Sequence, residues 1–191
     1  QDISTYKSEN KSLSAGLKIG TGAVGGNVNA SAEKQKGDFA SVQEQSGINA
    51  GAGGFDINIK DKTTLVGGVI SSSADASKNN LSTGTLVASN IDNHEKYSAT
   101  STSVGFSTDG KKISAGLPSA MNAGGDQSST TNSAIANGTI NITSSDKASQ
   151  DTANTISHDT ANAANALTKQ YTEDMRNEIA NGFTATNLLA T

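Results

Sequence analysis

The chain has 191 residues, of which 33% are hydrophobic and only 4% aromatic, with no Trp, no Cys and a single Pro. So few large apolar side chains cannot fill the core of an ordinary compact domain. Charged residues make up 17% and the net charge is −4, which is too little charge for a typical disordered chain. This mild acidity and the single Arg, Arg176, argue against nucleic acid as a partner, because nucleic acid calls for a clustered basic surface.

Short apolar stretches and glycine turns alternate along the first three quarters of the chain. Phe55, Ile57 and Ile59 alternate with polar residues, as in a half-buried strand. Further apolar pulses follow at 65–66, 69–70, 81, 86–87 and 91, with polar turns between them. Spacing of this kind is typical of either a β-sandwich or a β-solenoid.

Two internal echoes decide between these folds. The segment 46–59 (SGINAGAGGFDINI) returns at 133–142 (SAIANGTINI), so that Ile48 corresponds to Ile135 and Ile59 to Ile142. A second echo relates 2–6 to 92–97, and both echoes have offsets near ninety residues. A sandwich has no reason to repeat, whereas a solenoid stacks similar layers. We therefore predict a mainly β fold, a right-handed β-helix over 1–143 made of about two degenerate units of ~90 residues. The echoes leave open whether 20–45 and 107–130 are coils or loops.

The last quarter changes to a helical pattern. Five apolar residues at four-residue steps form one stripe: Ala163, Leu167, Tyr171, Met175 and Ile179. Ser144 or Ser145 is the expected N-cap, and Asn181-Gly182 the expected stop. We predict that 144–191 is a C-terminal α-helical segment that serves as a cap or linker.

The motifs of 37–106 resemble the second hemagglutinin-repeat region of filamentous hemagglutinins and CdiA-type effectors, which are two-partner-secreted exoproteins. The carrying segments are 46–59, TTLVGGVIS at 63–71, LSTGTL at 81–86, IDNH at 91–94 and 97–106. The opening residues 1–2 and 5–8 resemble the end of a preceding repeat. The segment ISHDTAN at 156–162 resembles the stretch between the last repeat and a C-terminal toxin, although the Val-Glu-Asn-Asn marker of many such toxins is absent.

The resemblance implies a very long, secreted protein at the bacterial cell surface, associated with the outer membrane. Its implied partners are an outer-membrane secretion partner, the target-cell outer membrane or a surface receptor, and neighbouring repeats of the same chain. Since the chain opens at Gln1 without an apolar leader, we expect an internal fragment. The function expected from this resemblance is a non-catalytic piece of a surface filament, used for display, adhesion and delivery of a toxin in contact-dependent growth inhibition.

Candidate chemistry in the chain is sparse. His94 stands beside Glu95 and His158 beside Asp159, but no further His or Cys exists to complete a metal site. The glycine runs at 51–54 and 22–26 lack the Lys-Ser/Thr of a phosphate-binding loop. Three isolated carboxylates, Asp75, Asp109 and Asp126, do not form a calcium-binding repeat. We therefore predict no catalytic, cofactor-binding or metal residues, no cofactor and no enzyme activity. The alternatives are a β-helix polysaccharide-active enzyme and a phage tail-fibre or spike segment.

Overall fold

A computed structural model describes residues 1–191 except 21–22, 110–111, 117 and 190–191. The chain divides into two compact units. We call the first the rung unit, which comprises 1–2, 40–94 and 128–168. The second, the ribbon unit, comprises 3–39, 95–127 and 169–191. Strands dominate both, so the prediction of a mainly β protein with helical elements near its end is confirmed.

The rung unit contains short parallel strands that stack in register. They are β3 (Gly47–Asn49), β4 (Phe55–Val66), β5 (Val69–Ser71), β6 (Asn79–Ser89), β10 (Ala134–Ile135) and β11 (Thr139–Ile142). One sheet has the order β10-β5-β3 and the other β11-β6-β4. Each pair of successive strands, such as β3 and β4, therefore forms one rung that contributes to both sheets. Backbone hydrogen bonds are satisfied between rungs rather than within them.

The register of the rungs explains the sequence echo. Ile48 and Ile135 both pair with Ile70, and Ile59 and Ile142 both pair with Thr83. The echoed residues thus occupy equivalent positions on either side of the second rung. The sequence repeat therefore arises because equivalent residues stack on one another in successive rungs.

Glycines allow the corners of the rungs to approach closely. Gly54 has φ 77°, and a Cβ there would lie 2.3 Å from the carbonyl oxygen of Lys78. At the next corner a Cβ on Gly138 would lie 2.4 Å from the carbonyl oxygen of Asn79. Any side chain at either position would push the stacked corners apart, so these glycines are needed for stacking.

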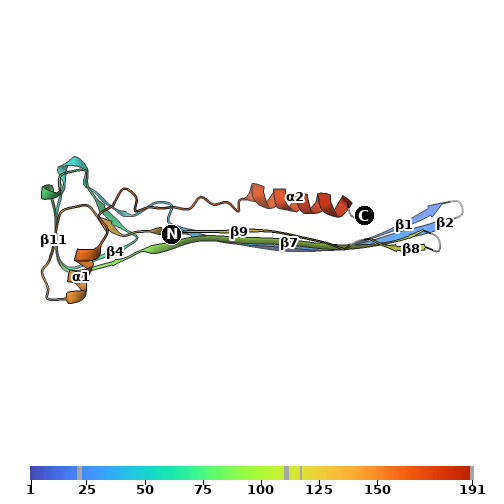
Figure 1. The fold of residues 1–191 in the computed structure, drawn as a ribbon, viewed down its shortest axis with the longest axis horizontal. Helices are drawn as coiled ribbons and strands as arrows, with labels where there is room; N and C mark the ends of the chain where they lie inside the picture. Colours follow the sequence, from blue (N-terminus) through green and yellow to red (C-terminus); the bar gives the residue numbers. More distant parts are fainter. Residues whose placement is uncertain (21–22, 110–111, 117, 190–191) are drawn as a thin grey trace. The chain divides into compact units, whose positions relative to one another are not determined.

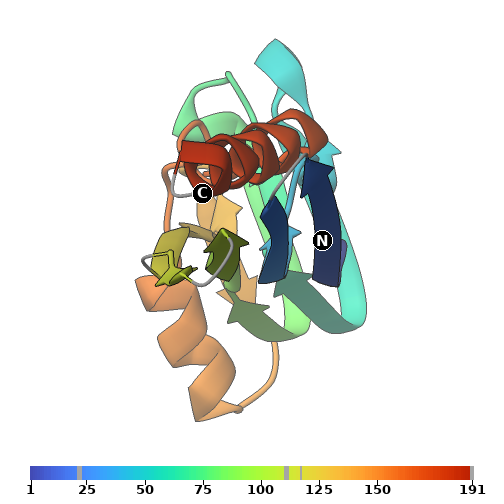
Figure 2. The same ribbon diagram turned by 90° about the vertical axis from the view of Figure 1, so that its right-hand side faces the viewer.

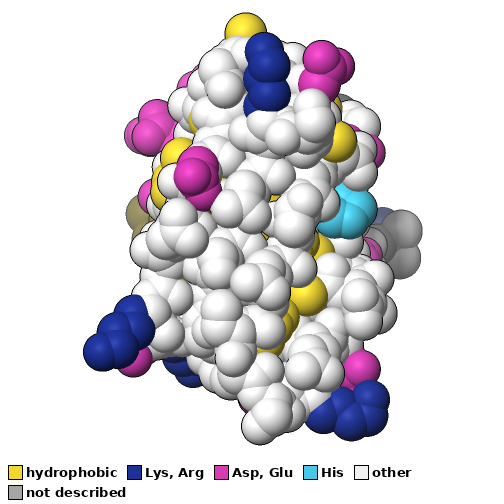
Figure 3. Space-filling model, turned by 90° about the vertical axis from the view of Figure 1, so that its left-hand side faces the viewer, with side chains coloured by type: hydrophobic (Ala, Val, Ile, Leu, Met, Phe, Trp, Pro, Cys, Tyr) yellow, Lys and Arg dark blue, Asp and Glu magenta, His cyan; other side chains and the backbone are white. Residues whose placement is uncertain are grey.

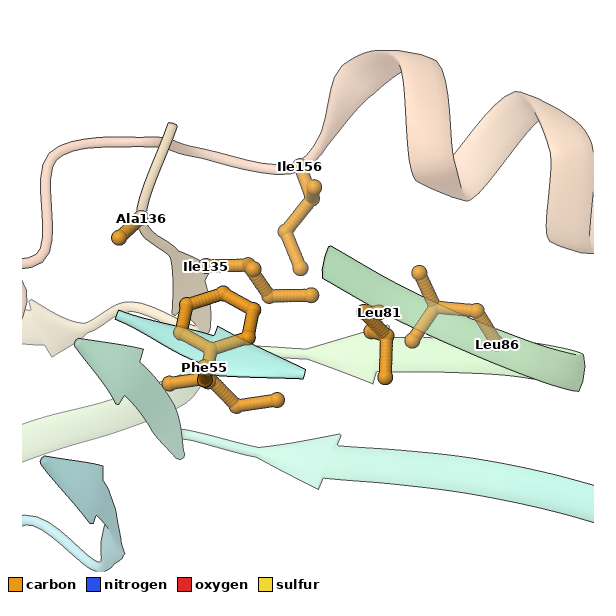
Figure 4. Packing of buried hydrophobic residues seen from close by; sticks show 7 residues of the cluster. Phe55, Leu81, Leu86, Ile135, Ala136 and Ile156 are labelled. Atoms are coloured by element: carbon orange, nitrogen blue, oxygen red, sulfur yellow. The ribbon is translucent and has the colours of Figure 1, made fainter. Parts of the chain in front are cut away.

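A narrow apolar core lies between the two parallel sheets (Figure 4). Its buried members are Phe55, Ile70, Leu81, Leu86, Ile135, Ala136 and Ile156. Ile57 and Ile140, at paired positions in the stack, are half-buried and pack against this cluster. At the end of the rung unit that carries β11 and α1, most of the surface is neither charged nor hydrophobic, and charged groups are scattered around it (Figure 3).

Helix α1 (Lys147–Thr155) closes one side of the rung unit. Its N-cap is Asp146, not the predicted Ser144 or Ser145, because the Asp146 carboxylate accepts hydrogen bonds from the Ser149 amide at 2.9 Å and hydroxyl at 2.6 Å. Those bonds lower the pKa of Asp146 below its ordinary value. The Ser149 hydroxyl in turn accepts a bond from the Leu86 amide at 3.0 Å, which ties the helix to β6.

The ribbon unit is built from much longer strands than a β-helix coil would supply (Figure 1). Its sheet has the order β1-β2-β7-β8, and β9 also pairs with β7. The strands are β1 (Asp2–Gly20), β2 (Ala23–Ser41), β7 (Ile91–Asp109), β8 (Lys112–Ala115) and β9 (Ser119–Thr131). β7 and β8 are antiparallel, with Phe106 opposite Ala115.

The expectation of a solenoid throughout 1–143 is therefore met by stacked parallel strands only in the rung unit, and the described residues form no closed β-helix. Of the segments 20–45 and 107–130, left open between coils and loops, the first lies mainly in β2, which ends at Ser41, and the second in the end of β7, the short strand β8 and most of β9. Residues 42–45 lie in no strand. The echo of 2–6 at 92–97 relates β1 to β7. Each repeat thus begins with ribbon strands and continues with rungs. Small polar residues specify the pairing register of such strands only weakly.

The prediction of a helical stripe along the tail is wrong over the first half of the stripe. Residues 157–172 form no helix, and α2 (Glu173–Leu189) begins after the predicted Ala163, Leu167 and Tyr171 positions. These three side chains are nevertheless buried. Side chains hold the extended backbone in place of helical bonds; the Leu167 amide, for instance, donates to the Ser41 hydroxyl at 2.9 Å. α2 also continues past Asn181-Gly182, and it lies along one face of the ribbon strands (Figures 1 and 2).

Candidate functional site

The most elaborate side-chain arrangement in the described residues is a tyrosine cluster within the ribbon unit. It consists of Tyr6 on β1, Glu95 and Tyr97 on β7, Tyr171 just before α2, and Arg176 in its first turns. All three tyrosines of the chain belong to it. The cluster fixes the segment 169–172, and hence the start of α2, on the ribbon sheet.

Glu95 is the polar centre of the cluster. Its side chain is only 2% exposed, although it is a carboxylate. It accepts hydrogen bonds from the amides of Gln170 at 2.9 Å and Tyr171 at 2.8 Å, and from Nε2 of Gln127 at 2.5 Å. A buried carboxylate is tolerated only when donors surround it in this way. Glu95 therefore replaces the intrahelical bonds that 170–171 lack.

Tyr171 is enclosed by aromatic rings. Its ring stacks on Tyr97 with centroids 4.8 Å apart and planes at 7°, and meets Tyr6 edge-on at 6.0 Å. Its hydroxyl donates to Oε1 of Gln35 at 2.7 Å. Stacked and edge-on pairs both suit the ring quadrupole, so this packing adds to the effect of burial.

Arg176 covers the outer side of the cluster. Its guanidinium lies 4.3 Å from the Tyr6 ring centroid and 5.6 Å from that of Tyr171, and its Nη1 donates to the Tyr171 carbonyl at 3.2 Å. The pKa of Tyr171 is raised above its ordinary value, chiefly by burial, while the charge of Arg176 acts in the opposite direction. The neutral phenol is therefore the form that the cluster holds.

The histidines and carboxylates that the sequence offered as candidate site residues do not come together in the structure. His94 is exposed, whereas His158 Nδ1 lies 2.8 Å from the Ile135 carbonyl oxygen within the rung unit. Asp75 lies between β5 and β6 in the rung unit, while Asp109 is on β7 and Asp126 on β9. No group of three or more His, Asp or Glu side chains in the described part of the chain is placed to hold a metal ion. Gly22, in one of the two glycine runs, lies outside the described residues.

His94 was the candidate in the sequence, with Glu95 considered only as its neighbour, but the buried residues are those on either side of it. Asn93 and Glu95 are buried, while His94 points outward. Asn93 belongs to the rung unit, where its Oδ1 accepts from the Val42 amide at 2.9 Å and its Nδ2 donates to the Thr131 hydroxyl at 2.9 Å. The period-two pattern of IDNHEKY places Asn93, Glu95 and Tyr97 on one side of β7, and this signal could have found them.

Stacked parallel rungs in one unit and long ribbon strands in the other define a mainly β protein with an internal repeat. No family model and no solved structure matches the chain. Among known proteins it is similar to CdiA proteins, which are far longer. It is 47% identical over 146 residues to "tRNA nuclease CdiA" of Burkholderia pseudomallei, covering 70% of this chain and 11% of that protein.

Two further relatives cover more of the chain. The "16S rRNA endonuclease CdiA" of Enterobacter cloacae subsp. cloacae is 37% identical over 183 residues, which are 91% of this chain and 6% of that protein. The "Deoxyribonuclease CdiA" of Dickeya dadantii is 37% identical over 187 residues, with the same two coverages, 91% and 6%. The chain is thus similar to a short part of CdiA-type proteins.

These names correct the expected function. The chain was predicted to be a non-catalytic fragment and not an enzyme, but the relatives are named as nucleases. The prediction weighed only the histidines, carboxylates and glycines of 191 residues. Since the chain spans 11% of one relative and 6% of two others, the composition of this stretch could not report what the longer proteins do.

Among the described residues, no helix has the length and apolar character needed to cross a membrane.

Proposed function

We propose that this chain is a segment of a CdiA-type nuclease toxin that acts in contact-dependent inhibition between bacteria. The observation that carries the proposal is the 37% identity over 91% of the chain to CdiA proteins named as nucleases. Within such a protein, we assign the chain to the second hemagglutinin-repeat region and the pre-toxin segment after it. The stacked strands support this assignment, because they make the repeats a structural unit.

In this proposal 1–143 is the repeat domain, 144–191 is the cap or linker that follows it, and the rungs continue a right-handed β-helix. The register Ile48–Ile70–Ile135 supports a stack to which further rungs can be added. β3 and β4 end their sheets, so their outer edges are free to pair with a neighbouring repeat of the same protein.

The proposed protein is secreted through an outer-membrane partner and meets the outer membrane or a surface receptor of the target cell. An exposed apolar face of the ribbon supports a membrane partner. Leu13, Leu17 and Ile19 of β1 are 76%, 73% and 73% exposed, and Ile113 of β8 is 78% exposed. Contiguous exposed apolar surface commonly marks an interaction site.

Strand pairing places these side chains on one face. Ser12 and Ser31 bond to each other across β1 and β2, and Thr108 bonds to Gly26 across β7 and β2. Since side chains alternate, odd positions of β1 share a face with even positions of β2 and β7. Thr108 also pairs with Ile113. Further exposed apolar residues on this face are Val24, Val28 and Phe106.

The experiment that tests the proposal uses the full-length protein that contains this chain. Its nuclease activity is measured on tRNA, 16S rRNA and DNA, and its effect on mixed cultures is measured with and without cell contact. We expect cleavage of one of these substrates and inhibition only on contact. A full-length protein that cleaves none of the three would disprove the proposal.

The membrane part is tested by flotation of the chain with vesicles of outer-membrane lipids. Leu17→Asp places a charge on the apolar face, and Ser14→Asp is its matched control on the opposite face of β1. We expect Leu17→Asp to lose flotation and Ser14→Asp to retain it. Equal flotation of both variants would contradict the assigned face, and no flotation of the unmodified chain would point to a protein receptor.

A further inference from the structure

The ribbon unit contains a hollow of about 350 Å³ on the surface of three of its strands, β1, β2 and β7. Three lysines line it, one from each strand: Lys7, Lys36 and Lys96. Thr5, Asp38 and Ser98 also line it, and Tyr6, Gly37 and Tyr97, which lie between these residues along the strands, complete the lining. We call the three lysines together with Thr5, Asp38 and Ser98 the lysine hollow.

The lysines share one face of the sheet, opposite the tyrosine cluster. Tyr6 and Tyr97 contact the ring of Tyr171, and a Cβ on Gly37 would also meet that ring. Lys7, Lys36 and Lys96 are the sequence neighbours of these three residues, and successive side chains of a strand point to opposite faces. All three lysines are exposed, as this placement requires.

The charges of the hollow are not neutralised by ion pairs. The ion pairs of the described residues join Lys11 to Glu9 and Lys147 to Asp151, and neither includes a residue of the hollow. Among the residues that line the hollow, three ammonium groups and the carboxylate of Asp38 give a charge of about +2, on a chain whose net charge is −4. Glu9, two residues further along β1, also attracts Lys7, but it is paired with Lys11 at 3.0 Å. Since adjacent strands lie about 4.8 Å apart, the roots of the lysines span about 10 Å.

We propose that the lysine hollow binds a multiply charged phosphate group, either free or on a lipid headgroup. Exposed ion pairs contribute little one at a time, so one singly charged ligand gains too little to stay bound. A ligand with several phosphate charges can meet all three ammonium groups together. The hydroxyls of Thr5 and Ser98 supply further donors at the margin of the same hollow.

Asp38 sets how tightly the anion binds. Its carboxylate stands among the lysines and repels a phosphate group, while it attracts the ammonium groups that the phosphate needs. Removing its charge should strengthen anion binding, whereas removing lysine charges should weaken it. Opposite changes in anion affinity from two kinds of substitution in the same hollow identify the binding site more specifically than a general loss of positive charge does.

The test is calorimetric titration of the chain with tripolyphosphate at low salt. The second arm is flotation on vesicles of cardiolipin, whose headgroup carries two phosphates, or of phosphatidylcholine. The triple variant Lys7→Gln, Lys36→Gln, Lys96→Gln should weaken tripolyphosphate binding roughly tenfold or more, and Asp38→Asn should tighten it about threefold. Lys60→Gln with Lys62→Gln on β4 is the control, since both are exposed lysines of the rung unit. Near-ultraviolet circular dichroism of the tyrosines verifies that the ribbon-unit variants are folded, and far-ultraviolet circular dichroism does so for the Lys60/Lys62 control.

Equal affinity of the triple variant and the unmodified chain would overturn the proposal, and so would an equal loss in the Lys60/Lys62 control. Preference for cardiolipin vesicles, lost in the triple variant, identifies a lipid headgroup as the source. Binding of tripolyphosphate without vesicle preference identifies a free phosphate ligand. The titration involves neither nuclease activity nor contact between cells, so its failure is distinguishable from failure of the proposed function.

Discussion

A methyl group on Gly37 would lie 2.3 Å from Cδ1 of Tyr171 and 2.7 Å from its Cε1. Gly37 is therefore required by the closeness of the ring, and not by a left-handed backbone conformation. Tyr171 has little room to withdraw, because it stacks on Tyr97 and its hydroxyl is bonded to Gln35. The absence of one side chain on β2 thus makes space for the centre of the tyrosine cluster.

Gly37→Ala should displace Tyr171 and loosen the start of α2. We expect the free energy of unfolding to fall by about 1–3 kcal/mol, the usual cost of forcing an extra carbon into a packed site. Urea unfolding measures this change. Gly53→Ala is the control, because a Cβ at Gly53 meets nothing within 4 Å and its φ is not positive. Unchanged stability of Gly37→Ala would show that the ring is free to move.

Alkaline pH should release the cluster. Burial raises the pKa of Tyr171 above its ordinary value of 10.0, so the folded state favours the neutral phenol. This contribution to stability is fully present below pH 10 and is lost as the pH rises through the folded-state pKa. Because all three tyrosines lie in the cluster, their near-ultraviolet signal reports on it alone.

An absorbance titration of tyrosinate checks this pH dependence. We expect one ionisation to occur at higher pH than that of a free tyrosine derivative, together with loss of the near-ultraviolet circular dichroism. Tyr171→Phe should remove that late step, since phenylalanine keeps the ring but has no proton to lose. A late step that persists in this variant would assign it to another tyrosine.

The rung core should be far more sensitive than its outer surface. Leu81 is fully buried at the middle of the stack, while Val87 on the same strand is 42% exposed. Leu81→Ala should therefore destabilise the protein by about 2–5 kcal/mol, through lost burial and the cavity left behind. Val87→Ala should cost under about 1 kcal/mol, because less apolar area is lost. Thermal unfolding of both variants tests the difference, and similar costs would contradict the assigned core.

The sequence predicted the stacking in the rung unit better than the long strands of the ribbon unit. The match of Ile48 with Ile135 and of Ile59 with Ile142 gave the correct equivalence of strands, because inward apolar positions recur when rungs stack. The long strands β1 and β7 were not foreseen. Their Ser, Thr, Asn and Gly residues suit a coil, a loop or a ribbon alike, and only pairing with distant strands chooses among them.

The tyrosine cluster could not be predicted from the sequence, for a different reason. Tyr171 was placed in a helical stripe by its four-residue spacing from Leu167, yet neither residue is helical. What holds the Tyr171 backbone is Glu95, 76 residues away in the sequence. No local pattern around Tyr171 contains that carboxylate. The alternation around Glu95 showed which side of β7 it occupies, but not what it would meet there.

Glu95→Gln should weaken the cluster while preserving the shape of the side chain. The carboxylate accepts bonds from the Gln170 and Tyr171 amides and from Nε2 of Gln127. An amide has only one acceptor oxygen, and its NH₂ group would face these donors. We expect a loss of about 1.5–3 kcal/mol, the range for hydrogen bonds to a charged group.

The loss should appear first in the segment that Glu95 holds. Limited proteolysis should cut Glu95→Gln near 169–172 faster than the unmodified chain, and the tyrosine circular dichroism should fall. Glu44→Gln removes a carboxylate from an exposed position and serves as the control. If both variants resist protease equally, rings and not the carboxylate hold the segment. A selective effect in Glu95→Gln would establish that a buried charge on β7 positions the chain at the start of α2.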